Sequence, residues 1–297
     1  MIAKRIVWVA AVAAVAALAG CSGSSDPWQE PDATVKILAH DLAAGHPETA
    51  WEALPASYRE DVQSLLREAT ERLDGQLWDA SFRTLGKLGR VIEEKREFIL
   101  ANPMLQSQKE AIPGLERSLD GMASTLHTIA ESDLASFDRL AELDIGEFLA
   151  TTGVELMAKL RSIPAAEGEE SWADSFDKLG RTTVTVLSRE DGRAVLRIEV
   201  PDEEPREEAW VRVEDRWVPE EIASSWSDNI SKMRDAIRGA EATDTEEKRQ
   251  AAMMQLAVVD GVLDQLLATK TAEEFNSKIG AIFGLLMGAM MNQSSTS

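Results

Sequence analysis

The stretch TTVTVLSREDGRAVLRIEV, residues 182–200, decides the fold class of this chain of 297 residues. Every second residue in its second half is apolar: Ala194, Leu196, Ile198 and Val200. Alternation of this kind predicts a strand with one buried face. The pair Asp191-Gly192 is a typical two-residue hairpin turn. The stretch therefore predicts two antiparallel strands joined by a tight turn.

The next residues extend this pattern. Residues 201–205 form an acidic segment bounded by prolines, after which apolar and polar side chains alternate again over 209–213. The pair Glu214-Asp215 then provides another turn before the apolar residues 217–218. We expect one small antiparallel β-meander of three or four strands, over about 182–218.

The sequence on both sides of the meander has helical spacing. Residues 33–164 form a predicted helical region, in which Ser57-x-x-Glu60 is expected to be a capping box that starts a helix. Residues 165–219 hold a linker and the meander, and residues 220–297 hold the C-terminal helices. The expected fold class is α+β, mostly α, with a helical bundle or helical hairpins. Residues 33–297 are compatible with a single domain.

One apolar row in the C-terminal helices stands out. Its members are spaced three or four residues apart and are predicted to face a neighbouring helix: Ala252, Leu256, Val259, Leu263 and Leu266.

Composition excludes two classes of partner. The chain has 52 acidic and 31 basic residues, which gives a formal net charge of −21 at pH 7. Nucleic-acid binding needs clustered cations that neutralise phosphates, so no nucleic acid is expected. Electrostatic docking to anionic lipid is disfavoured for the same reason. Hydrophobic residues make up 44% of the chain, which is enough to build a core.

Residues 1–20 have the pattern of a signal peptide. Lys4 and Arg5 are followed by a run of apolar residues from Ile6 to Ala19. This run is shorter than the roughly 20 residues that a helix needs to cross a bilayer. The run ends in Leu18-Ala19-Gly20-Cys21, which resembles the lipobox of bacterial lipoproteins. The resemblance implies cleavage before Cys21 and lipidation of that cysteine.

The lipoprotein resemblance implies a location as well as an anchor. Two or more acyl chains hold a protein stably at a membrane. Residues 21–32 are then the lipidated cysteine and a flexible tether, and the exported body lies at a bacterial membrane. Ser22 stands where inner-membrane lipoproteins usually carry aspartate, which favours the periplasmic face of the outer membrane. Cys21 is the only cysteine, so no disulfide framework is expected.

Two weaker resemblances concern the body. The stretch WEALPASY at 51–58 and the stretch KREFIL at 95–100 resemble segments of uncharacterised exported bacterial proteins, which implies no activity. The helix containing Trp51, followed later by VRVEDRWVP at 211–219, is similar to cystatin-like and nuclear-transport-factor-like cone modules. That resemblance implies an apolar pocket, with Trp210 and Trp217 as wall residues. The long helical region between the two motifs departs from such modules.

Motifs for catalysis and for metal binding are weak. The three histidines, His40, His46 and His127, lack the close array that a zinc site needs, so no metal and no other cofactor is expected. Three short segments match the penicillin-recognising motifs in order: Ser175 to Lys178, Ser227 to Asn229 and Lys270 to Ala272. The last segment lies between two predicted helices rather than on a strand, and it has alanine in place of glycine. No residue is therefore assigned a catalytic role.

Glycines recur near the C-terminus at intervals of four residues. Gly280, Gly284 and Gly288 would share one face of a helix in a segment without charge. Each interior glycine costs about 1 kcal/mol relative to alanine, so a packing role is expected. Such a helix either docks on the protein's own core, or it pairs with another subunit or touches lipid.

The sequence favours a membrane-anchored envelope lipoprotein that acts as a non-catalytic interaction or scaffold module. The alternative is a pocket protein of cone-fold type that binds a small molecule or lipid. An enzyme of unknown class is the third hypothesis.

Overall fold

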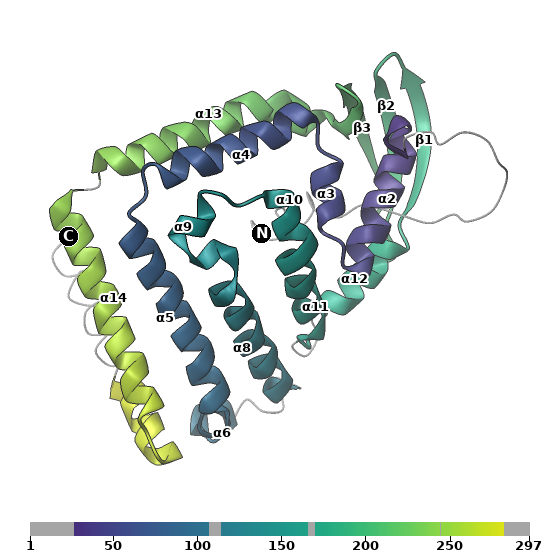
Figure 1. Ribbon diagram of the computed structural model, residues 1–297. Helices are drawn as coiled ribbons and strands as arrows, with labels where there is room; N and C mark the ends of the chain where they lie inside the picture. Colours follow the sequence, from purple (N-terminus) through teal and green to yellow (C-terminus); the bar gives the residue numbers. More distant parts are fainter. Residues whose placement is uncertain (1–26, 107–113, 166–169, 244, 282–297) are drawn as a thin grey trace, which may run out of the picture.

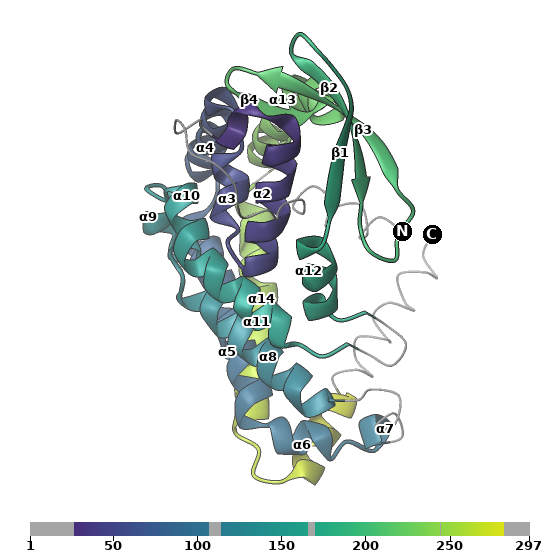
Figure 2. The ribbon, with the colours of Figure 1, turned by 90° about the vertical axis from the view of Figure 1, so that its right-hand side faces the viewer.

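The computed structural model describes residues 27–106, 114–165, 170–243 and 245–281 (Figure 1). Four helices lie side by side in one layer, in the order α14, α5, α8 and α11, and Figure 2 shows this layer from its edge. Their bounds are Glu246–Leu267, Gly75–Glu94, Leu115–Glu131 and Val154–Ser162, respectively. Together with one small sheet, these helices confirm the predicted α+β, mostly α fold class.

The sheet has four antiparallel strands in chain order, β1-β2-β3-β4. The strands are β1 (Thr183–Glu190), β2 (Arg193–Glu199), β3 (Arg206–Val213) and β4 (Arg216–Pro219). Gly192 has a φ of 75° in the turn between β1 and β2, a conformation that glycine adopts without strain. The meander predicted from the alternating pattern is therefore confirmed, with four strands.

One hydrophobic core lies between the sheet and the two helices α2 (Pro31–Ala44) and α12 (Trp172–Gly180). A Cβ atom at Gly180 would lie 2.9 Å from Ala43 Cβ, so the two helices make close contact at their C-terminal ends. The buried residues of this sheet core are Val35, Ala39, Leu42, Leu179, Val184, Ala194, Leu196, Ile198, Trp210 and Trp217.

The prediction of a flexible tether over residues 21–32 is wrong for residues 27–32. Residues Pro27–Gln29 form a short 3-10 helix, η2, and α2 begins at Pro31. The Trp28 side chain is only 8% exposed. The small and polar residues around this tryptophan suggested a tether, but burial of the indole fixes the segment to the body.

Helix α4 (Ala56–Thr70) begins differently from the prediction. Ser57 lies inside the first turn, the N-cap is Pro55, and the predicted capping box is absent. The carboxylate of Glu214, in the turn between β3 and β4, instead accepts the N–H groups of Ala56 at 2.9 Å and Ser57 at 3.3 Å. A tertiary contact with the sheet thus caps this helix.

Helix α5 has a local cap and a close neighbour. Asp74 Oδ1 accepts the N–H of Leu77 at 2.8 Å, which satisfies one free donor at the start of the helix. On its α8 side, a Cβ atom at Gly89 would lie 2.7 Å from His127 Cδ2. Buried residues at this interface are Ile92, Leu119 and Ala123.

The remaining elements are mostly short. Helix α13 (Glu220–Thr243) follows β4 directly and runs alongside α4 (Figure 1). The others are α3 (Glu48–Glu52), α6 (Arg96–Leu100), α7 (Pro103–Gln106), η3 (Asp133–Ala135), α9 (Phe137–Leu140), α10 (Ile145–Phe148) and η4 (Leu149–Gly153).

After α14 the chain is helical again over residues 272–281. Phe275 in this segment is 1% exposed and packs with Val91 of α5 and with Leu263 and Leu266 of α14. Within the described ranges, no helix combines the length and the apolar character that a membrane crossing requires.

Candidate functional site

Several predicted site residues lie outside the described part of the chain. Cys21, the predicted lipidation site, and the signal peptide precede residue 27. Gly284 and Gly288 follow residue 281. Gly280 is described and exposed, and a Cβ atom there would meet nothing within 4 Å. The predicted helix interface therefore stays a prediction.

Trp210 and Trp217 are both part of the sheet core, with exposed fractions of 3% and 2%. Trp217 Nε1 donates a hydrogen bond to the Gln29 carbonyl at 3.0 Å. Trp210 Nε1 is buried and has no hydrogen-bond acceptor among the described residues. Neither tryptophan lines the surface hollows described next, and their pocket-wall role stays a prediction.

One surface hollow, of about 830 Å³, lies where the N-terminal ends of α5 and α14 meet α9. Arg249 Nη1 lies 3.2 Å from Asp74 Oδ2 and joins α14 to α5. The Leu77 hydrogen bond and the Arg249 guanidinium lower the pKa of Asp74. Asp79 Oδ1 accepts the N–H of Phe137 at 2.9 Å. Asp74 and Asp79 therefore cap and join helices in this hollow.

A second hollow, of about 530 Å³, lies between α5 and α8 and is lined in part by Arg90 and His127. Arg90 pairs with Glu94 at 3.0 Å, and His127 Nδ1 lies 3.7 Å from Glu93 Oε2. The imidazole of His127 packs on Gly89. This histidine therefore fills a helix–helix contact, and the lining carries both signs of charge.

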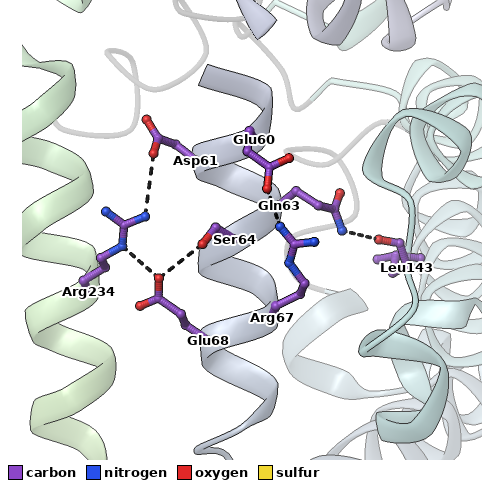
Figure 3. A network of polar contacts seen from close by, with 8 residues as sticks. All are labelled: Glu60, Asp61, Gln63, Ser64, Arg67, Glu68, Leu143 and Arg234. Atoms are coloured by element: carbon purple, nitrogen blue, oxygen red, sulfur yellow. Dashed lines mark hydrogen bonds and ion pairs between the residues drawn. The ribbon is translucent and has the colours of Figure 1, made fainter. Parts of the chain in front are cut away.

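A polar network fixes α4 between its neighbours (Figure 3). Arg234 Nε of α13 donates to Glu68 Oε1 at 2.9 Å, and the guanidinium lies 3.6 Å from Asp61 Oδ1. The hydrogen bond from Arg234 lowers the pKa of Glu68. On the other side of α4, Gln63 Nε2 donates to the Leu143 carbonyl at 2.6 Å. These contacts serve packing, since each polar group is bonded to another part of the fold.

An apolar surface on α14 is the clearest candidate for an interaction. Met254 is 69% exposed and Val258 is 63% exposed. Lys87 of α5 pairs with Asp260 at 2.6 Å and with Asp264 at 2.9 Å, which fixes the side of α14 that faces α5. A helix has 3.6 residues per turn, so positions 258 and 260 point in nearly opposite directions. Val258 therefore faces away from α5, whereas the exposed Met254 also borders the hollow between α5, α9 and α14.

Sequence reasoning missed this surface. It selected the row that includes Leu263 and Leu266, which are indeed buried, and Val259, which is 47% exposed. The neighbouring row was also visible in the sequence, because Ala251, Met254, Val258 and Gly261 have helical spacing. A helix that is apolar on two sides normally needs a second neighbour.

The weaker chemical motifs are distributed over different elements. Ser175 and Lys178 lie on α12, Ser227 lies on α13, and Lys270 follows α14. Lys178 pairs instead with Glu170 at 3.2 Å and with Asp202 at 3.4 Å. In the part of the chain that the structure describes, no group of three or more histidine, cysteine, aspartate or glutamate side chains is arranged to hold a metal ion.

No protein-family model, no curated protein and no solved structure matches this chain.

Proposed function

We propose that this chain is an exported lipoprotein, anchored to a bacterial membrane through Cys21, whose folded body is a non-catalytic interaction module. The lipobox-like Leu18-Ala19-Gly20-Cys21 supports the anchor. The periplasmic face of the outer membrane is the favoured location. The exposed apolar surface of α14 is the single observation that carries the interaction role.

This surface, which we name the α14 face, consists of Ala251, Met254, Val258 and Gly261. Met254 and Val258 are the two most exposed large hydrophobic side chains in the described part of the chain. Burial of apolar area stabilises an association by about 25 cal/mol per Å² before the costs of binding. Exposed apolar side chains at neighbouring positions on one helix face are a candidate contact with another protein. The row of small and apolar residues suits an apolar helix as the partner.

The pocket hypothesis has one observation in its favour. A buried indole N–H without an acceptor is costly, and Trp210 Nε1 is such a group among the described residues. A ligand carbonyl or hydroxyl in the sheet core would satisfy it. Native mass spectrometry of the body tests this alternative, because a bound molecule adds mass that disappears on denaturation.

Lipidation is tested with the Cys21→Ser variant in the full chain. The native chain should incorporate labelled palmitate and sediment with membranes, whereas Cys21→Ser should do neither. Equal membrane retention of both chains would contradict the anchor.

The α14 face is tested by placing a photo-crosslinking amino acid at Met254 or at Val258 in living cells. Ser227 on α13, which is also exposed, is the matched control position. We expect one discrete adduct from positions 254 and 258, lost when Gly261→Glu is added, and no such adduct from position 227. An adduct of twice the chain mass would identify a second copy as the partner. Equal labelling from all three positions would contradict a specific α14 interface.

A further inference from the structure

The first described residues are fixed firmly to the sheet. Trp217 Nε1 and Arg212 Nη2 donate to the carbonyl and the side-chain oxygen of Gln29, at 3.0 Å and 2.7 Å. Arg189 of β1 forms an ion pair with Glu30. Three strands thus hold the segment that leads toward the N-terminus, and its position in the fold is determined from η2 onward.

The chain between the anchor and this fixed point is short. Pro27, the first residue of η2, follows Cys21 by only six positions. A fully extended chain spans at most about 3.3–3.6 Å per residue, so six steps cover at most about 22 Å. A lipid on Cys21 therefore keeps η2 within about 22 Å of the bilayer surface.

We propose that the end of the molecule formed by η2, β3 and β4 faces the bilayer. The proposal rests on the lipidation of Cys21 proposed above. Figures 1 and 2 both place the sheet at one end of the molecule and α6 at the opposite end. Helix α6 and residues 272–281 then point away from the membrane.

The orientation also decides what the α14 face meets. Helix α14 lies at the edge of the helical layer that is farther from the sheet (Figure 1). Val258 on that face points away from α5, into the space beside the anchored body. A protein partner in the envelope, rather than the anchoring bilayer, is the occupant that this geometry fits.

The test uses two matched serine-to-cysteine variants of the full, acylated chain. Ser188 is exposed beside Arg189 at the sheet end, and Ser277 is exposed in the helical segment 272–281. Since Cys21 is the only native cysteine and is blocked by its lipid, each variant has one free thiol for a fluorescent donor. The labelled chains are placed in phosphatidylcholine vesicles that carry a headgroup-linked acceptor.

We expect a larger loss of donor emission from Ser188→Cys than from Ser277→Cys. Equal or reversed losses in vesicle-bound chains would overturn the orientation and leave the lipid anchor intact. Adding Cys21→Ser to each variant leaves the introduced cysteine as the single thiol for the donor. These doubly substituted chains should show no vesicle binding and no energy transfer. Vesicle binding that persists in these doubly substituted chains would instead overturn the anchor, and the orientation with it.

Discussion

At the scale of single residues, Glu214 joins the sheet to the helical part of the fold. Its carboxylate accepts two N–H groups from the first turn of α4, and its own φ of 55° lies in the left-handed region. Hydrogen bonding from Ser57, then the N–H of Ala56, and the charge of Arg59 lower the pKa of Glu214 below its ordinary value of 4.5. The charged form is therefore the form that the folded state stabilises.

We predict that Glu214→Gln lowers stability at neutral pH and has less effect in acid. The pKa is lower in the folded state, so the contribution of the carboxylate is fully present above pH 4.5 and is lost as the pH falls through the folded pKa. Chemical denaturation of both proteins at about pH 7 and about pH 3, on either side of the ordinary glutamate pKa, measures this difference. A stability difference that is the same at both pH values would show that the charge does not cap α4.

At the scale of elements, some helices approach each other closely at a glycine, where no space is left for a methyl group. Gly180 at the end of α12 faces Ala43 of α2, whose Cβ is attached directly to the backbone and cannot rotate away. Gly261 in the interior of α14 has nothing within 4 Å of its Cβ position. The two glycines therefore differ in the space that a side chain would find, although the intrinsic helix propensity of glycine is the same at both positions.

The same substitution at these two positions should have opposite effects. Gly180→Ala should destabilise the protein by about 1–3 kcal/mol, because α2 and α12 must move apart. Gly261→Ala should stabilise it by about 0.5–1 kcal/mol, because alanine is the better helix former and meets no neighbour. Urea unfolding midpoints at constant m-value measure both changes. Destabilisation by Gly261→Ala would show that the α14 face already has a neighbour in the free protein.

At the scale of the whole molecule, repulsion between like charges opposes folding. The net charge of the chain is −21. Ion pairs such as Arg193–Glu220 and Arg197–Glu207 join surface side chains, but they do not change this net charge. Exposed pairs of this kind contribute about 0–1 kcal/mol each. Unbalanced negative charge over the compact state is the larger effect at low salt.

Added salt should therefore raise the thermal stability of the body. The Debye length falls from about 30 Å at 0.01 M to about 8 Å at 0.15 M, which screens the long-range repulsion. A gain of about 1 kcal/mol would raise Tm by about 2–4 °C for a domain of roughly this size. Thermal melts in sodium chloride over this range provide the measurement. A lower Tm in salt would mean that the surface ion pairs outweigh the net charge.

The sequence by itself determined the types of the elements. Period-two alternation in residues 182–218 predicted the meander, and helical spacing on both sides predicted the helices, because these patterns reflect one-sided burial along a short stretch. The sequence also carries the lipobox-like motif at Cys21, which is a local signal and needs no fold.

Only the tertiary structure decided which groups meet across the chain. The cap on α4 comes from Glu214, more than 150 positions away, and so no local motif could reveal it. Trp28 lies in a stretch whose sequence is typical of a tether, and only the tertiary structure shows that its side chain is buried. Val258 and Leu263 are both apolar residues of one helix, yet only Leu263 is buried, because residues 272–281 and α5 cover one side of α14. Periodicity shows that a residue is apolar and on which face it lies, whereas burial depends on whether another element covers that face.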